Sequence, residues 1–219
     1  LLRNLFAHSH VPPIKKNVPE LRFPEFKGEY FSTKLEHIPD ICGGKRLPKG
    51  YSLTSTKNNH PYITISDMNK HTVLLDNIKY VPNEIVKKIE KYVIFDSDLY
   101  ITVAGTIGIV GKIPSTLNGA NLTENADKIT NIQINQNYLL YYLNTGALKK
   151  LIEKNRTDNA QPKLALKEIR KMSIIFPSDE EQEKIANFLS AIDKKIELME
   201  EKLNHLKQFK KGLLQKMFC

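Results

Sequence analysis

A polar stretch in the second half of the chain carries side chains that suit binding to nucleic acid. Amide groups such as those of Asn159 and Gln161 can form paired hydrogen bonds with the edge of adenine, and Arg156 and Lys163 can contact phosphate. An ordinary exposed loop has the same kind of composition, so this stretch alone leaves both interpretations open. We take Asn159 and Gln161 as candidate base contacts, and Lys163 as a candidate groove or phosphate contact.

Three further segments offer similar chemistry at places where the chain is expected to turn. The sequence CGGKRLPKGYS, residues 42–52, contains a glycine pair, which predicts a flexible loop, together with three cations and a tyrosine. Arg46 is its candidate groove or phosphate contact. The candidate DNA-binding residues in these segments are Lys45, Arg46, Lys49, Tyr51, Ser66, Asn69, Lys70 and Thr106.

The distribution of charge in the first four fifths of the chain would suit a polyanionic partner. The formal net charge is +9, but residues 180–219 carry eight Lys against seven Asp and Glu, so residues 1–179 hold +8 of it. Lys and Arg that neutralise phosphates release condensed counterions, which drives binding to DNA. A basic surface that serves only solubility is the alternative.

Motifs for nucleotide binding and methyl transfer are incomplete. The segment GTIGIVG, residues 105–111, lacks the dinucleotide fingerprint, and it lacks the Gly-Lys-Ser/Thr of a P-loop because Lys112 is followed by Ile113 and Pro114. A structural turn is the better interpretation. Methyl transfer to amino groups of bases calls for an Asn-Pro-Pro-Tyr or Asp-Pro-Pro-Tyr motif, and neither string occurs.

A metal-dependent nuclease site is not expected. Pro39-Asp40 could begin such a site, but the later Asp/Glu-x-Lys matches, at residues 193–195 and 200–202, fall on a predicted helix. The solvated face of that helix explains those charges more simply. The sequence therefore predicts a chain without enzymatic activity of its own.

Cysteine, histidine and apolar patterns predict a cytoplasmic protein without a structural metal. The two cysteines, Cys42 and Cys219, do not make a disulfide framework. Only the His8 and His10 pair has the spacing of zinc ligands. No apolar run approaches the roughly 20 residues of a membrane helix. The N-terminal segment is also too short and polar for a secretory signal.

The elements that must position the candidate residues predict an α+β fold. We expect an extended N-terminal arm over residues 1–29, one mixed α/β domain over residues 30–177 and a long coiled-coil helix over residues 178–219. Glycine inside a helix weakens it, so Gly146 is a weak point. Strands are predicted within residues 61–69, 72–81, 95–114 and 172–176, helices over residues 83–94 and 135–155, and a loop over residues 156–171.

Apolar residues after Pro177 alternate in steps of four and three, the heptad pattern of a coiled-coil seam. From Ile185 to Met217 the helix would extend about 50 Å, more than a small domain covers, so a partner helix is expected. Packing onto its own domain is the alternative. Lys210 occupies one seam position, and the apolar members are Ile185, Leu189, Ile192, Ile196, Met199, Leu203, Leu206, Leu213 and Met217.

Three stretches resemble the DNA-specificity subunits of type I restriction-modification systems. VPELRFPEFKGEY, residues 18–30, is similar to their opening segment, and DSDLYITVAGTIGIVGKI, residues 96–113, resembles the Gly-Thr-x-Gly strand pair of their target-recognition domains. The most specific stretch, residues 159–197, resembles the junction between such a domain and the conserved helix after it.

The resemblance implies a non-catalytic subunit that reads one half of a split DNA site. Residues 30–177 would form a target-recognition domain whose loops enter the major groove, and residues 178–219 a conserved spacer helix. Family members usually hold two such modules whose helices pair antiparallel, and this chain has one. A second copy that pairs antiparallel through the seam would restore the layout with true twofold symmetry and read inverted repeats.

The same resemblance assigns the chemistry to partner subunits. A modification methyltransferase subunit would bind S-adenosylmethionine and a restriction/translocase subunit would use ATP, so this chain is expected to need no cofactor of its own. The competing hypotheses are a coiled-coil interaction or assembly protein and an inactive remnant of a split specificity gene. An enzyme that acts alone on nucleic acid ranks third, and it would have to show turnover without added subunits. Sequence-selective, salt-dependent binding to double-stranded DNA distinguishes them.

Overall fold

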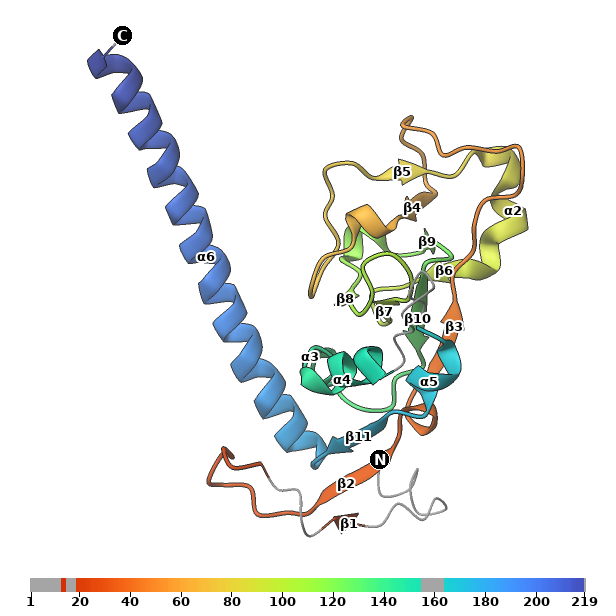
Figure 1. Cartoon of the computed structure of the whole chain (residues 1–219), viewed down its shortest axis with the longest axis vertical. Helices are drawn as coiled ribbons and strands as arrows, with labels where there is room; N and C mark the ends of the chain where they lie inside the picture. The colour runs from red at the N-terminus through yellow and green to blue at the C-terminus, as the bar shows by residue number, and fades with distance from the viewer. Residues whose placement is uncertain (1–12, 15–18, 155–163, 219) are drawn as a thin grey trace.

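The computed structural model describes residues 13–14, 19–154 and 164–218 (Figure 1). A mixed α/β domain leads into one long helix, α6 (Asp179–Phe218), which projects from the base of the domain. This is the α+β arrangement that the sequence predicts. In the three described ranges, no helix is both long and apolar enough to cross a membrane.

A small antiparallel sheet joins the two ends of the domain. Its central strand pairs on one side with the arm and on the other with the strand that precedes α6, with Phe176 opposite Phe31. Pro177 follows that strand, and α6 starts two residues later. The sheet order is β1 (Pro13–Ile14), β2 (Tyr30–Lys34) and β11 (Ser173–Phe176).

Two four-stranded sheets form the body of the domain. One is antiparallel throughout, and the other contains a single parallel pair, β4 with β9. The first has the order β3 (Asp40–Gly43), β10 (Ala126–Thr130), β7 (Leu99–Thr102) and β8 (Val110–Lys112). The second has the order β5 (Lys79–Tyr80), β4 (Pro61–Ile63), β9 (Ala120–Leu122) and β6 (Val93–Ile94).

The helices are short apart from α6. The predicted helix at residues 83–94 is present as a 3-10/α/3-10 succession followed by β6. The α-helices are α2 (Val86–Ile89), α3 (Gln136–Leu143), α4 (Gly146–Lys154) and α5 (Leu166–Arg170), and the 3-10 turns are η1 (Leu35–His37), η2 (Ile65–Asp67), η3 (Asn83–Ile85), η4 (Glu90–Tyr92) and η5 (Ser115–Leu117).

The largest core cluster lies where the antiparallel four-stranded sheet meets α3, α5 and the first turns of α6. Ile101 and Ile129 from the sheet, Leu139 from α3 and Ile169 from α5 are fully buried in it. Ala186 of α6 belongs to the same cluster. The helix therefore begins inside the core of the domain rather than on a flexible linker.

The single helix predicted over residues 135–155 is wrong, because the structure has two. Asn144 ends α3: its backbone N–H reaches the Leu140 carbonyl, and its side-chain amide donates to Leu140 O and to Val110 O of β8. The break allows α4 to pack over the β7–β8 turn, where Ile152 lies against Gly108. Tertiary contacts thus override the continuous apolar pattern.

Two other predicted segments are also corrected. The expected loop 156–171 contains α5, because Leu164 and Ile169 are buried in the core and Leu166 packs against it. In the predicted strand 72–81, only Lys79–Tyr80 form a ladder, and Val73 makes an isolated bridge to Met68. Exposed Leu74 and Leu75 show that this apolar run is not a buried strand.

The described end of the arm is bound to the first turns of α6 by a buried ion pair. Arg22 donates to both carboxylate oxygens of Glu181, with N to O distances of 2.7 and 2.6 Å, and the Tyr30 hydroxyl donates to the same carboxylate at 3.0 Å. The Glu181 side chain is 2% exposed. Nearby, Phe23 meets Phe188 edge-on. The arm therefore helps to fix the base of the helix.

Candidate nucleic-acid interface

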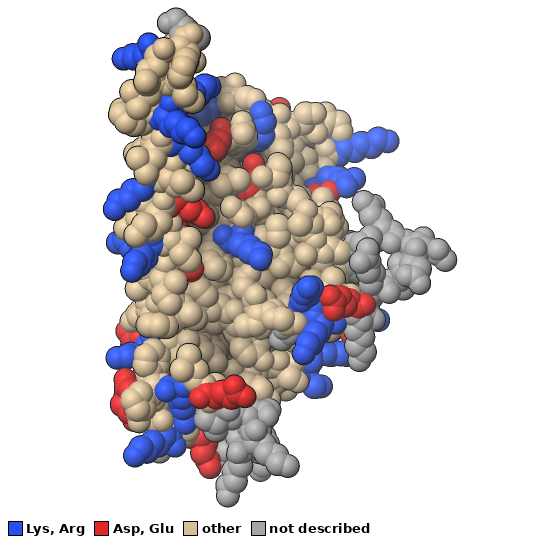
Figure 2. Space-filling model, turned by 60° about the vertical axis from the view of Figure 1, so that its left-hand side comes forward, with Lys and Arg blue, Asp and Glu red and all other residues tan. Residues whose placement is uncertain are grey.

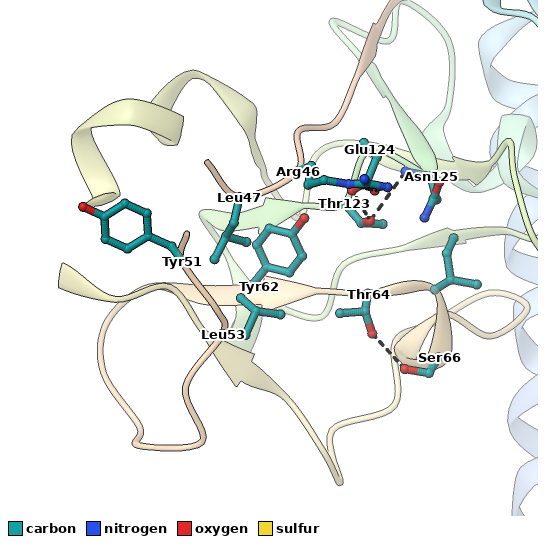
Figure 3. Close-up of a pocket in the computed structure, with 11 residues that line it drawn as sticks. Arg46, Leu47, Tyr51, Leu53, Tyr62, Thr64, Ser66, Thr123, Glu124 and Asn125 are labelled. Carbon is teal, nitrogen blue, oxygen red and sulfur yellow. Dashed lines mark hydrogen bonds and ion pairs between the residues drawn. The ribbon is translucent and has the colours of Figure 1, made fainter. Parts of the chain in front are cut away.

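Residues from loops far apart in the sequence line one hollow of about 450 Å³ on the domain (Figure 3). Arg46 and Tyr51 come from the loop after β3, Ser66 from η2, and Glu124 from the turn between β9 and β10. Of the predicted DNA-binding residues, the fold thus brings Arg46, Tyr51 and Ser66 to one place.

Backbone contacts fix the start of the loop that carries Lys45 and Arg46. Gly44 N–H donates to Ala126 O, and Lys45 N–H donates to Leu122 O, at 3.0 and 2.8 Å. A Cβ at Gly44 would lie 2.1 Å from Thr123 O, so this close approach requires glycine. The glycine pair therefore serves a tight contact with β9 and β10, in place of the flexible loop that its sequence suggests.

Arg46 forms an ion pair that sequence reasoning did not find. Its Nε lies 2.6 Å from Oε1 of Glu124. Burial pushes the pKa of the Glu124 carboxyl upward, but hydrogen bonds from Arg46, from its own backbone and from Thr123 lower it below its usual value overall. The carboxylate is therefore charged at neutral pH. Its Nη2 lies 2.6 Å from the same oxygen, but the Arg46 side chain remains 78% exposed, so the guanidinium group still faces solvent beyond this pair.

Two cation–ring contacts join the same loop to α2 and η4. The Lys45 ammonium lies 5.6 Å from the ring centre of Tyr92, and Lys88 of α2 lies 5.4 Å from that of Tyr51. Tyr51 is 38% exposed, and Lys49 is exposed beside it in the loop. Lys88 was not a predicted site residue. Its place on a separate helix gave no sequence signal that it would reach Tyr51.

The η2 region and the β7–β8 turn supply a second group of exposed polar residues. Ser66, Asn69 and Lys70 are all exposed. Asn69 O accepts the hydroxyl of Tyr100 at 2.6 Å, which fixes the loop on β7. Thr106 is exposed in the turn whose Gly105 faces Ile65 of η2, so Thr106 adjoins this group.

The predicted contacts Arg156, Asn159, Gln161 and Lys163 lie outside the described residues. The chain is described again from Leu164, which lines a hollow together with Lys45, Arg46 and Glu124. In the described ranges, no group of three His, Cys, Asp or Glu side chains is placed to share a metal ion. His8 and His10 also lie outside these ranges.

The seam of α6 divides into two parts. Ile185 packs against the domain core, and Leu189 is half-buried in a hollow with Tyr138 and Tyr141 of α3. From Ile192 onward, the apolar members are 41–71% exposed in this single chain. The exposed seam comprises Ile192, Ile196, Met199, Leu203, Leu206, Leu213 and Met217.

Negative and positive charges are separated along the length of α6. Residues 179–201 contain eight Asp and Glu and three Lys, a net of −5, whereas residues 202–218 contain five Lys and no acid, a net of +5. Figure 2 shows blue side chains along the upper, C-terminal part of the helix. The net charge of the whole helix is close to zero because its two halves carry opposite charges.

Comparison with known proteins decides the family. A sequence model described as the type I restriction modification DNA specificity domain matches residues 29–208, most of the chain. The protein belongs to this family. The matched range includes the loops around the hollow of Figure 3 and all but the end of the exposed seam.

Solved structures share the fold of this specificity-domain protein. A chain from a study of complex assembly and conformational transition of the type I R-M system is 17% identical, with a TM-score of 0.64 over 99% of this chain and 50% of its own. The type I restriction-modification S subunit from M. genitalium is 16% identical, with a TM-score of 0.57 over 84% and 44%. The HsdS subunit from Thermoanaerobacter tengcongensis is 17% identical, with a TM-score of 0.58 over 84% and 41%. The chain thus spans half or less of these relatives.

Proposed function

We propose that the chain is the DNA-recognition subunit of a type I restriction-modification complex and that it reads one half of a split site. The observation that carries the proposal is the convergence of Arg46, Tyr51 and Ser66 on one hollow, in a chain of the DNA specificity domain family. Exposed cations there suit phosphate or guanine, and exposed Asn69 suits adenine.

We propose further that the chain is non-catalytic and acts in the cytoplasm beside its DNA. A modification methyltransferase subunit would carry S-adenosylmethionine, and a restriction/translocase subunit would use ATP. The nuclease-like acids support this division of labour: Asp40 accepts the Asn131 amide at 2.6 Å, while Asp193 accepts the Tyr141 hydroxyl at 2.6 Å on a different element. Both side chains have structural partners.

We infer that a second copy pairs antiparallel with the exposed seam. In the exposed seam, residues 192–201 carry four acids and two Lys, a net of −2, and residues 208–217 carry three Lys and no acid, a net of +3. Antiparallel pairing sets these two segments against each other, whereas parallel pairing sets like charges together. Centring the pairing on the exposed seam places Leu203 opposite Leu206, Ile196 opposite Leu213, and Ile192 opposite Met217. This register leaves Ile185 and Leu189 to their own domain, where they already pack.

Selective DNA binding tests the recognition role. The chain is purified with its modification subunit and used to enrich binding sites from a pool of random DNA duplexes. The affinity for the most enriched sequence is then measured over a range of salt concentrations. Enrichment of one motif, with affinity that falls as salt rises, is the expected result. Binding without sequence preference would instead favour an interaction protein or an inactive remnant.

A further inference from the structure

Polar contacts hold helix α6 to its domain at two places, on either side of Ile185 and Ala186, which pack on the core. The first is at Gln182, which is fully buried: its side-chain carbonyl accepts Asn135 N–H, and its amide donates to Pro177 O, both at 2.9 Å. Arg22 of the arm forms an ion pair with the neighbouring Glu181. A helix held only here could still pivot about its base.

The second place is at Asp193, three turns further along. The Tyr141 hydroxyl donates to Asp193 Oδ2 at 2.6 Å and lies 3.2 Å from Ser190 Oγ, and His71 Nδ1 lies 3.3 Å from the same Asp193 oxygen. The His71 and Tyr141 rings meet edge-on at 5.3 Å. We call Tyr141, His71 and Asp193 the latch.

Both domain residues of the latch are themselves fixed. His71 N–H donates to Val110 O, and Lys112 N–H donates to His71 O, so the loop is tied to β8. His71 has a φ of 70°, a left-handed conformation that a side chain rarely adopts without support. Tyr141 lies on α3, where burial and then the bond to Asp193 raise its pKa to about 12, so its hydroxyl keeps the proton.

The space between the two places is not filled. A hollow of about 400 Å³ lies between parts of α3 and α6 and is lined by Tyr138, Tyr142, Ile185 and Leu189 with the latch residues. Beyond Asp193 the helix projects from the domain (Figure 1). In the described part of the chain, Asp193 therefore makes the outermost polar contacts between the domain and α6.

Distances along α6 determine how far a change at the latch would move the exposed seam. Asp193 lies about 16 Å along the helix from Gln182, and the middle of the exposed seam lies about 34 Å from it, at 1.5 Å per residue. An opening of about 2 Å at the latch would therefore displace the seam centre by about 4 Å, roughly one base-pair rise. Twofold pairing would double the change in separation between the two domains.

We propose that the latch sets the number of base pairs between the two half-sites. Its members are positioning residues: they fix the angle of α6 and touch neither bases nor phosphates. This inference rests on the proposed function. It predicts that losing the latch alters the spacing of the target while leaving the half-site sequences unchanged.

Variants Tyr141→Phe and Asp193→Asn test the proposal when coexpressed with the modification subunit in a methylation-free host. We expect the same half-sites as in the wild type, but with two or more spacer lengths that differ by about one or two base pairs where the wild type accepts one. Tyr142→Phe is the matched control, because its hydroxyl bonds Ser173 O rather than α6. One unchanged spacer length in both latch variants would overturn the proposal.

A distance measurement tests the latch independently of methylation. Spin labels are placed at Ser115→Cys in the domain and Gln208→Cys on α6, in a background with Cys42→Ser and Cys219→Ser, and labelled chains are diluted with unlabelled ones. Tyr141→Phe should widen the distance distribution by about 4 Å. Superimposable distributions would refute the latch. A wild type that methylates no motif, although Tyr141→Phe changes the distances as expected, would contradict the proposed function but would support the latch as the contact that fixes the angle of α6.

Discussion

Arg46 and Glu124 show how single side chains prepare the candidate interface. Sequence reasoning selected Arg46 from its glycine-containing loop, but Glu124 lies 78 positions away and only the β9–β10 turn brings it near. The contact between Lys88 and Tyr51 was missed for a similar reason, because the two residues lie on separate elements 37 positions apart. Loop chemistry is local and can be predicted, whereas the partner of a loop residue depends on how distant strands pair.

The Arg46 side chain is predicted to contact a DNA phosphate or a base edge. In Arg46→Gln, the dependence of log affinity on log salt should become shallower by about one unit per half-site, because one fewer counterion is released. Lys184→Gln is the control, since Lys184 pairs with Glu25 at the base of α6. A salt slope and affinity equal to the wild type in Arg46→Gln would remove this residue from the interface.

The Glu181 carboxylate is predicted to stabilise the whole domain. Glu181→Ala leaves Arg22 and Tyr30 without their shared partner in a buried site, which should lower the free energy of unfolding by about 3 kcal/mol. Urea-induced unfolding followed by circular dichroism measures the change. Glu25→Ala, which removes an exposed pair with Lys184, should cost under about 1 kcal/mol. Equal losses in the two variants would contradict this role.

Among the elements, those with a strong period were predictable from the sequence and those shaped by tertiary contact were not. The heptad pattern predicted α6, and β-branched runs predicted β7, β8 and β11. The break between α3 and α4 lies directly before Gly146, the weak point of the predicted helix, but the bond from Asn144 to Val110 O that supports it joins distant parts of the chain and leaves no local pattern. Helix α5 did leave a signal, because Leu164 and Ile169 are apolar positions inside an otherwise polar stretch.

The packing of α4 over the β7–β8 turn gives a prediction at this scale. Gly108 has a φ of +87°, and an added Cβ would lie 2.4 Å from Ile152 Cδ1, so Gly108→Ala should lower the free energy of unfolding by roughly 1–3 kcal/mol. Gly212→Ala within α6 meets no atom within 4 Å and should raise it by up to about 1 kcal/mol. Thermal unfolding compares the two, and a neutral Gly108→Ala would contradict the packing argument.

At the scale of the whole molecule, the domain and helix form a unit that presents one exposed loop cluster, the proposed DNA contact, and one exposed seam. The arm, the Gln182 contacts and the latch all fix the helix to the domain. The rigid attachment means that pairing two helices would also set the separation of two loop clusters. The heptad pattern predicted the seam. The charge reversal between the two halves of α6 is also present in the sequence, but a sum over the whole helix cancels it.

Cysteine crosslinking tests the antiparallel register. In a Cys42→Ser, Cys219→Ser background, Ile196→Cys/Leu213→Cys should form disulfide-linked dimers under mild oxidation, because these positions face each other in the proposed pairing. Ile196→Cys alone should not crosslink, since its copies would lie about 25 Å apart along the helices. Efficient crosslinking of the single variant would indicate parallel pairing.

The methylation pattern that the chain directs tests the proposed recognition role and the homodimer most directly. The chain is coexpressed with its modification subunit in a methylation-free host, and adenine methylation is mapped by long-read sequencing. A symmetric pair of these chains should direct methylation to one split motif whose halves are inverted repeats. An asymmetric motif that requires a second specificity chain would contradict the homodimer. The absence of methylation, with all subunits soluble and assembled, would contradict the recognition role itself.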